Sequence, residues 1–186
     1  ERKTHFLNNT NLPIKFVELL EIAYDGNRNR DFEIITMELF RKIYGFGGVL
    51  LGGGRKPDGV IFTNDYGVII DTKAYSNGYS KSIAQEDEMV RYIEDNQLRD
   101  TERNPIEWWS NFPATITEDK FYFMWISSKF IGRFHEQLVS TFQRTNSFGA
   151  ALNVEQLLLG ADAIQKGQLS KDDIAEYMRN EEIKWV

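Results

Sequence analysis

Two aspartates and a lysine flank apolar, β-branched runs, and their spacing predicts that they meet at one end of a β-hairpin. Asp58 precedes one run and Asp71 ends the other, with Asn64 and Asp65 between the two runs. We take Asn64 and Asp65 as a two-residue turn, because short polar side chains tolerate left-handed backbone. In that register Asp58 lies directly opposite Asp71. Lys73 projects from the same face, because side chains alternate along a strand.

Two opposed carboxylates favour a divalent cation between them, because like charges facing each other destabilise a β-ladder. Mg²⁺ suits such a site, since it takes oxygen ligands and keeps several waters, and Mn²⁺ is the expected substitute. We predict that Asp58, Asp71 and the main-chain carbonyl of Thr72 bind the metal. Lys73 would then orient the attacking water and neutralise charge on a phosphate. The alternative is a surface hairpin with an ordinary Asp–Lys pair.

These residues also resemble a known nuclease signature. Pro57-Asp58 and Asp71-Thr72-Lys73 are similar to the two halves of the PD-(D/E)-x-K motif. The wider sequence resembles the cleavage domain of the FokI-like type IIS restriction endonucleases, and the similarity runs from about Phe16 to the C-terminus. It rests on segments 51–59, 65–76, 87–92, 104–109 and 154–158. The hairpin turn is shorter here than in the family, which leaves the catalytic triplet unchanged.

The resemblance implies a metal-dependent DNA endonuclease domain with Asp58, Asp71 and Lys73 as catalytic residues. It also implies a DNA-recognition domain in the parent chain, double-stranded DNA as substrate, and a prokaryotic, cytoplasmic enzyme. Two alternatives stay open. One is a catalytically silent module that uses the same fold for DNA binding or dimerisation, which the intact triplet disfavours. The other is a nuclease of the same superfamily acting on repair intermediates, which only the FokI-like sequence outside the motif disfavours.

The predicted helix 82–98 offers a route to a second copy of the domain. Asp87 and Arg91 lie one turn apart on it with opposite charges. Across a two-fold axis, an antiparallel copy presents its Arg91 to this Asp87, and the reverse, which is an isologous interface. The resemblance implies the same contact in a weak homodimer, with each copy cutting one strand. The alternative is an ion pair within the helix, worth about 0.3–0.5 kcal/mol.

The net charge of the chain limits the affinity that we expect the domain to have for DNA. The 186 residues carry a net charge of −6, and DNA affinity rests on lysine and arginine neutralising phosphates. We therefore expect weak DNA binding by the domain alone. Basic residues nevertheless group near the predicted site, and a second group follows later in the chain: Arg55, Lys56 and Lys81, then Lys129 and Arg133. No base-reading motif is present, so we expect cleavage without sequence preference.

Composition narrows the class further. With 41% hydrophobic residues the chain is expected to be globular, and without cysteine it has neither disulfides nor cysteine–zinc sites. No apolar run is long enough to span a membrane. The sequence begins at Glu1 rather than Met, so we expect a fragment of a longer enzyme, with a linker or frayed N-terminus at 1–12 and the nuclease domain at 13–186.

Alternating helices and strands predict an α/β fold, with a central mixed sheet covered by helices on both faces as in restriction endonucleases. Besides the hairpin, the pattern predicts strands at 121–126 and 149–152, and helices at 13–24, 29–44, 82–98, 134–144, 154–165 and from 170. The glycine-rich stretch 45–54 is expected to be a loop that allows close backbone approach. Trp108 and Trp109 are expected in the core. We favour a solvated helix face for Glu33, with an extra metal ligand as the alternative.

Overall fold

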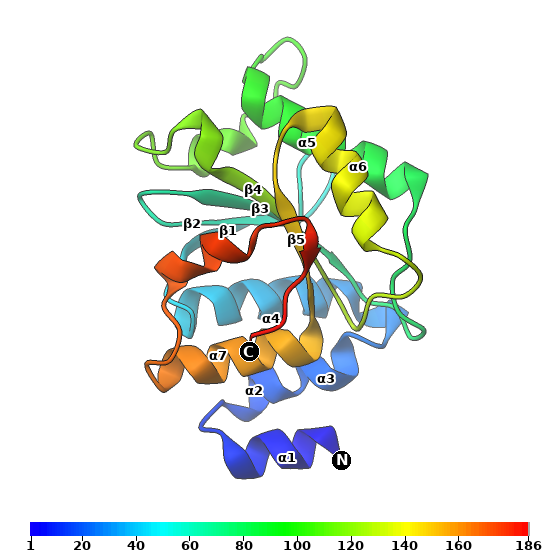
Figure 1. Ribbon diagram of the computed structural model, residues 1–186, viewed down its shortest axis with the longest axis vertical. Coiled ribbons are helices and arrows are strands. Elements are labelled where there is room, and N and C mark those ends of the chain that lie inside the picture. Colours follow the sequence, from blue (N-terminus) through cyan, green and yellow to red (C-terminus); the bar gives the residue numbers. More distant parts are fainter. Residues whose placement is uncertain (186) are drawn as a thin grey trace.

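The computed structural model describes residues 1–185, and a six-stranded mixed sheet runs through its centre (Figure 1). The strands lie in the order of the chain. β1, β2 and β3 pair antiparallel, whereas β3 to β6 pair parallel. Their bounds are Gly47–Leu50, Gly59–Phe62, Gly67–Lys73, Phe121–Ser127, Gly149–Asn153 and Glu181–Glu182. The predicted fold class is confirmed.

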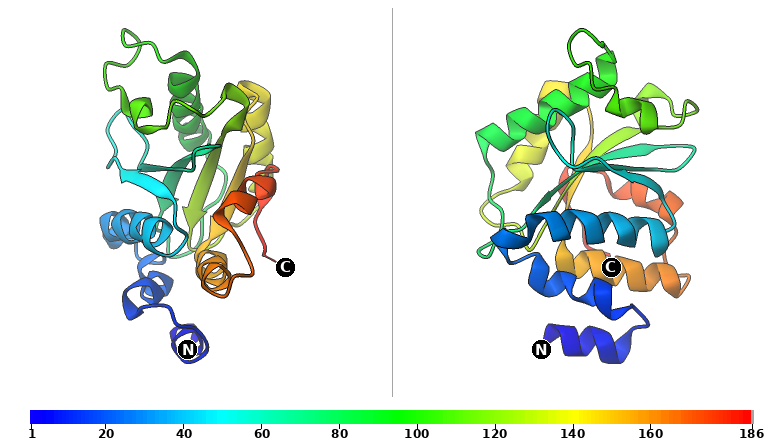
Figure 2. Two further views of the ribbon diagram at one scale, coloured as in Figure 1. Left: turned by 90° about the vertical axis from the view of Figure 1, so that its left-hand side faces the viewer. Right: turned by 180° about the vertical axis from the view of Figure 1, so that it is seen from behind.

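Helices cover both faces of this sheet. The side that holds α5 and α6 lies opposite the side that holds α1 to α4 and α7 (Figures 1 and 2). The α-helices α1 to α7 span Arg2–Asn9, Ile14–Val17, Leu19–Ile22, Asn29–Lys42, Ile83–Leu98, His135–Thr145 and Val154–Gln165. Short 3₁₀ helices cover Gly26–Arg28, Trp108–Asn111, Glu118–Lys120 and Lys171–Tyr177.

The two helical layers enclose two separate cores because side chains alternate along each strand. Ile70 of β3 lies in the core on the α4 and α7 side, and Ile69 lies in the core on the α5 and α6 side. The second core also holds Trp108 and Trp109, as predicted. A strand buried on both faces cannot slip by one residue without reversing its whole packing, so the register of β3 is fixed.

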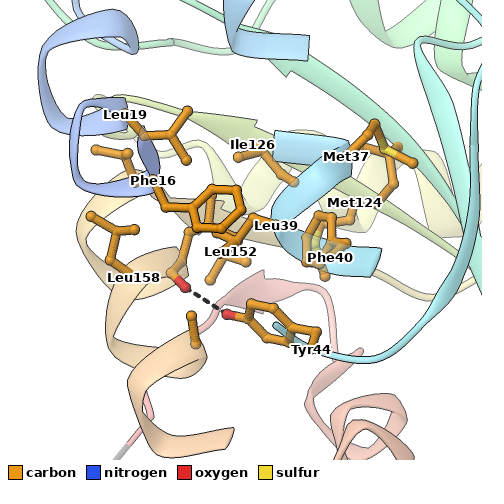
Figure 3. Packing of buried hydrophobic residues seen from close by; sticks show 14 of the residues in the cluster. Phe16, Leu19, Met37, Leu39, Phe40, Tyr44, Met124, Ile126, Leu152 and Leu158 are labelled. Atoms are coloured by element: carbon orange, nitrogen blue, oxygen red, sulfur yellow. Dashed lines mark hydrogen bonds between the residues drawn. The ribbon is translucent and has the colours of Figure 1, made fainter. Parts of the chain in front are cut away.

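Figure 3 shows how α4 is anchored in the first core. Phe40 and Leu39 pack near Met124 of β4, and all three are at most 1% exposed. The hydroxyl of Tyr44, just beyond α4, donates a hydrogen bond of 2.6 Å to the main-chain carbonyl of Leu157 in α7. This packing fixes the position of α4 against the sheet, and with it the polar side chains at its N-terminal half.

The β2–β3 hairpin has the predicted register but not the predicted turn. Ile61 pairs with Val68, which by continuation places Asp58 opposite Asp71. Asn64 and Asp65 do form the two-residue loop, yet neither has a positive φ angle. Instead, the Thr63 hydroxyl accepts hydrogen bonds from the main-chain N–H groups of Asp65 and Tyr66. A side-chain-capped turn therefore replaces the expected left-handed one.

The structure corrects the expectation for the N-terminus. Residues 1–12 are not a frayed linker, because helix α1 occupies Arg2–Asn9. Phe6 is only 3% exposed and belongs to the first core, and Lys3 forms ion pairs with Glu18 and Glu21. A single apolar anchor is too little to produce a recognisable helical pattern in a polar stretch.

Other differences concern short or irregular elements. The expected helix 13–24 is two short helices, and the segment after Ser170 is a 3₁₀ helix rather than an α-helix. Strand β1 lies within the glycine-rich stretch that was expected to be a loop. Its pairing with β2 overrides the low strand preference of glycine. The two-residue strand β6 was not predicted.

The packing of α1 against the first core can be tested by measuring the free energy of unfolding. Phe6→Ala removes a buried aromatic side chain and should lower the free energy of unfolding by about 3 kcal/mol. Leu7→Ala is the matched control, because Leu7 is 41% exposed and its loss should have little effect. Urea unfolding of both variants measures this difference. Equal and small effects would mean that α1 does not belong to the folded core.

Candidate active site

The hairpin brings Asp58 and Asp71 together at the end of β3. Asp71 is 2% exposed, on a strand that is buried on both sides. The Asp58 carboxylate accepts hydrogen bonds from the main-chain N–H of Thr72 at 2.8 Å and from the Thr72 hydroxyl at 3.2 Å. Thr72 therefore orients Asp58 through its amide and side chain, a role that the sequence did not suggest.

Lys73 completes the predicted triplet. Its ammonium nitrogen lies 2.9 Å from the Asp71 carboxylate and 5.7 Å from the ring centre of Trp125. Trp125 is the residue of β4 that pairs with Asp71, and it is 1% exposed. The indole face holds the cation and excludes water from one side of it. The structure thus places Asp58, Asp71 and Lys73 in one site, as the register predicted.

The charges in this site strongly perturb one another. Burial, and then the charge of Asp58, raise the pKa of Asp71 well above its usual range. Burial alone would raise the pKa of Asp58 too, but hydrogen bonds from its neighbours and the charge of Lys73 hold it below the usual value. Burial lowers the pKa of Lys73, but the charge and hydrogen bond of Asp71, together with the charges of Asp58 and Glu88, outweigh this and the net shift is upward. Lys73 is therefore a cation at neutral pH.

Glu33 of α4 is a further member of the site, and the favoured interpretation of a solvated helix face was wrong. Its side chain is 14% exposed and lies close enough to the Asp58 carboxyl group for that group to raise its pKa. Arg30, one turn earlier, forms an ion pair of 3.3 Å with Glu33. Burial, followed by the hydrogen bond and charge of Asp58, raises the pKa of Glu33 to about 7. The packing of α4 on the sheet, which no local pattern encodes, brings it there.

Helix α5 contributes Glu88 and Tyr92 on the other side. The Tyr92 hydroxyl donates a hydrogen bond of 3.0 Å to Glu88. Burial and then Glu88 raise the pKa of Tyr92, and the charges of Asp71 and Asp58 add to this shift. The charge of Glu88 also helps to raise the pKa of Lys73. Glu88 and Tyr92 therefore lie within electrostatic range of the triplet.

The donor set fits a hard divalent cation. Asp58 and Asp71 present carboxylate oxygens to each other at the cost of mutual repulsion, which a cation between them would relieve. Among residues 1–185 no three histidine, cysteine, aspartate or glutamate side chains form a ready-made metal cluster. Two carboxylates together with waters suit Mg²⁺, which is commonly held by one or two carboxylates.

The two predicted groups of basic residues are partly joined. The loops that carry Lys81 and Lys129 lie side by side, since the Tyr79 N–H donates to the Lys129 carbonyl at 2.8 Å. Lys81 and Arg133 both pair with Glu136 at the start of α6. These cations border the end of the sheet where the triplet lies, although Glu136 neutralises part of their charge.

The proposed dimer residues lie on α5 as predicted, but they do not pair with each other. Arg91 is exposed and forms no ion pair with any described residue. Asp87 instead pairs with Arg144 of α6 at 2.8 Å. The alternative of an Asp87–Arg91 ion pair within the helix is therefore wrong.

Comparison with known proteins gives the same picture over the whole length. The family model described as "FokI, cleavage domain" matches residues 1–184. This chain belongs to the FokI cleavage-domain family. The type II restriction enzyme FokI of Planomicrobium okeanokoites is 46% identical over 178 residues, which is 94% of this chain and 30% of that protein. The type II restriction enzyme StsI of Streptococcus sanguinis is 34% identical over 169 residues, 89% of this chain and 28% of that protein.

Solved structures of the family agree in fold. The structure of restriction endonuclease FokI matches with a TM-score of 0.95 and 43% identity, covering 99% of this chain and 33% of that one. The structure of FokI bound to DNA matches with a TM-score of 0.94 and the same identity and coverage. The chain thus spans about a third of the length of its relatives. None of the helices within residues 1–185 combines the length and apolar character that a membrane crossing requires.

The raised pKa of Glu33 predicts how the metal-free domain responds to pH. The folded state binds this proton more tightly than the unfolded chain does, because the pKa is about 7 in the first and about 4.5 in the second. This contribution to the free energy of unfolding is complete below pH 4.5 and is lost as the pH rises through 7. Thermal unfolding in EDTA between pH 5 and 8 measures it. Glu33→Gln should flatten the decline, whereas parallel curves for the two proteins would contradict the assignment.

Proposed function

We propose that this chain is the DNA-cleaving domain of a type IIS restriction endonuclease, and that it hydrolyses phosphodiester bonds with Mg²⁺. The observation that carries the proposal is the pair Asp58 and Asp71, held opposite each other beside Lys73 in a member of the FokI cleavage-domain family. A surface hairpin with an ordinary Asp–Lys pair would not bury a carboxylate to 2% exposure. A catalytically silent module would have no use for all three residues.

Each residue has a definite task in the proposed mechanism. The carboxylates of Asp58 and Asp71 and the main-chain carbonyl of Thr72 would hold the metal. When bound, the ion lowers the pKa of water and polarises phosphate oxygens. Lys73 neutralises the charge that develops on the phosphate as the water oxygen attacks phosphorus and one bridging P–O bond breaks. The indole of Trp125 keeps the ammonium group of Lys73 directed toward that phosphate.

The proposed substrate is double-stranded DNA, cut without sequence preference. A solved relative is a FokI structure bound to DNA, and FokI extends well beyond the region that this chain matches. We assign target recognition to another domain of the parent chain. The net charge of −6 supports this division, because a domain that binds DNA weakly cuts only where a recognition domain holds it.

Catalysis is tested with plasmid nicking at high enzyme concentration. Asp71→Ala should lower the rate in Mg²⁺ at least 1,000-fold (on the order of several kcal/mol of lost transition-state stabilisation) and should abolish the Mg²⁺-dependent rise in melting temperature. Lys73→Ala should lose rate while keeping that rise. EDTA should stop cleavage, and several unrelated plasmids should give smears rather than discrete fragments. Substantial nicking by Asp71→Ala would contradict the mechanism.

We further propose that two copies associate through α5 for double-strand cleavage, with Asp87 of each facing Arg91 of the other. The exposure of Arg91 and its lack of an ion pair among the described residues support this pairing. Arg144 already holds Asp87 in the single domain at 2.8 Å. The interface must therefore compete with, or share, that contact, which agrees with a weak dimer that forms when two copies are held on DNA.

Charge reversal tests the dimer. Asp87→Arg and Arg91→Asp should each retain nicking but lose double-strand cleavage, because each homodimer then opposes like charges. Mixing the two variants should restore double-strand cleavage, since opposite charges face each other again. Arg144→Ala is the matched control, because it removes the contact within the domain and leaves both interface residues in place. Full double-strand cleavage by both reversed variants would exclude this face of α5.

A further inference from the structure

The segment between β1 and Asp58 is a loop that the sheet alone does not fix. Its three consecutive glycines have positive φ angles of 79°, 84° and 80°, and a side chain at Gly53 or Gly54 would meet nothing within 4 Å. The loop is closed at its base, where the N–H groups of Leu51 and Gly52 both donate to the Asp58 carbonyl. This glycine-rich and exposed loop therefore ends at Asp58, a proposed metal ligand.

One short segment after α5 supplies the hydrogen bonds that hold this loop. Among residues 1–185, every hydrogen bond found for residues 53–57 joins Arg55 to Arg103 or Asn104. The Asn104 amide donates to the Arg55 carbonyl at 2.8 Å, and the Arg55 guanidinium donates to the Arg103 carbonyl at 2.6 Å. A cavity of about 230 Å³ lies between the loop and α5. Hydrogen bonds rather than close packing therefore fix the loop on this side.

Asn104 is itself held rigidly. It is 2% exposed, and its Nδ2 also donates to the carboxylate of Asp95 in α5 at 3.0 Å. Its Oδ1 accepts from the N–H of Ile106 at 2.9 Å. Asp95 is 7% exposed and accepts a second bond from Arg103 at 2.8 Å. Both N–H donors and the oxygen of the Asn104 side chain thus have partners, and one of the donors reaches the loop that leads to Asp58.

We propose that Asn104 is a positioning residue for DNA cleavage: by hydrogen bonding to the Arg55 carbonyl, it couples α5 to the loop that leads into Asp58. The inference rests on the proposed function of Asp58. Small displacements of a reacting group are costly in rate, so a loosened loop lowers turnover without removing any group that touches the substrate. The loop also carries Arg55 and Lys56, two of the basic residues that the sequence groups near the site.

An exchange of two side chains separates this role from a merely structural one. In the double variant Asp95→Asn/Asn104→Asp, the new amide at 95 donates to the new carboxylate at 104, so the bond between α5 and the following segment is kept. The acceptor for Ile106 and an acceptor for Arg103 are kept as well. The carboxylate at 104 has no proton to give to the Arg55 carbonyl, so the link to the loop is lost, while the Arg103 ion pair with residue 95 becomes a hydrogen bond to a neutral acceptor. The net charge is unchanged.

Two readouts follow the loop and the chemistry separately. Trypsin should cut after Arg55 at least 10-fold faster in the double variant, with a melting temperature close to that of the parent. Cleavage after Lys56 does not interfere, because Pro57 follows it. Plasmid nicking should fall about 10-fold in kcat and need more Mg²⁺ for half-maximal rate, with little change in KM for DNA.

The control is Asn111→Asp, because Asn111 also donates to a main-chain carbonyl, that of Trp108, and within residues 1–185 it makes no hydrogen bond to the Arg55 loop. It should leave tryptic cleavage at Arg55 and nicking within about 2-fold of the parent. Suppose that trypsin cuts after Arg55 faster in the double variant, but kcat and the Mg²⁺ dependence of nicking equal those of the parent. That result would overturn the inference. Unchanged tryptic cleavage would overturn it too, independently of whether Mg²⁺ proves to be the activating ion.

Discussion

The pairing of β2 with β3 forces Asp58 and Asp71 together, and the rest of the site follows from that contact. Each strand pair in the hairpin is held by main-chain hydrogen bonds, so the two carboxylates cannot move apart without breaking the ladder. Burial and then the charge of Asp58 raise the pKa of Asp71 well above its usual range, and the second of these causes is the repulsion between the two carboxylates. The fold imposes repulsion between these two carboxylates before any metal ion binds. A divalent cation that binds between them relieves this repulsion, so the site is well prepared for one.

The surrounding structure offsets this repulsion from three sides. Thr72 stabilises the charged form of Asp58 with two hydrogen bonds, and Lys73 lies against Asp71 over the ring of Trp125. On the α4 side, the raised pKa of Glu33, about 7, means that a proton neutralises this third carboxylate in about half of the molecules at neutral pH. The burial of β3 between two cores keeps all of these groups at fixed distances, which preorganised electrostatic catalysis requires.

The sequence was sufficient for the parts of the site that depend on one hairpin. The two apolar runs on either side of the Asn64–Asp65 turn give the register, and with it Asp58, Asp71 and Lys73. The sequence could not give Glu33 or Asn104, because their positions depend on how α4 and the segment after α5 pack against distant residues. The same limit applies to the fold. Helix α1 rests on the single buried Phe6, and β1 is a strand only because β2 pairs with its glycines.

The central claim is that the opposed carboxylates Asp58 and Asp71 bind a divalent cation. A crystal structure with Mn²⁺, in which anomalous scattering identifies the ion, tests this most directly. The account predicts a peak between Asp58 and Asp71, with oxygen ligands at about 2.0–2.3 Å that include the Thr72 carbonyl. A well-ordered Asp58–Asp71 pair without an anomalous peak at saturating Mn²⁺, or a peak bound only elsewhere on the domain, would contradict it.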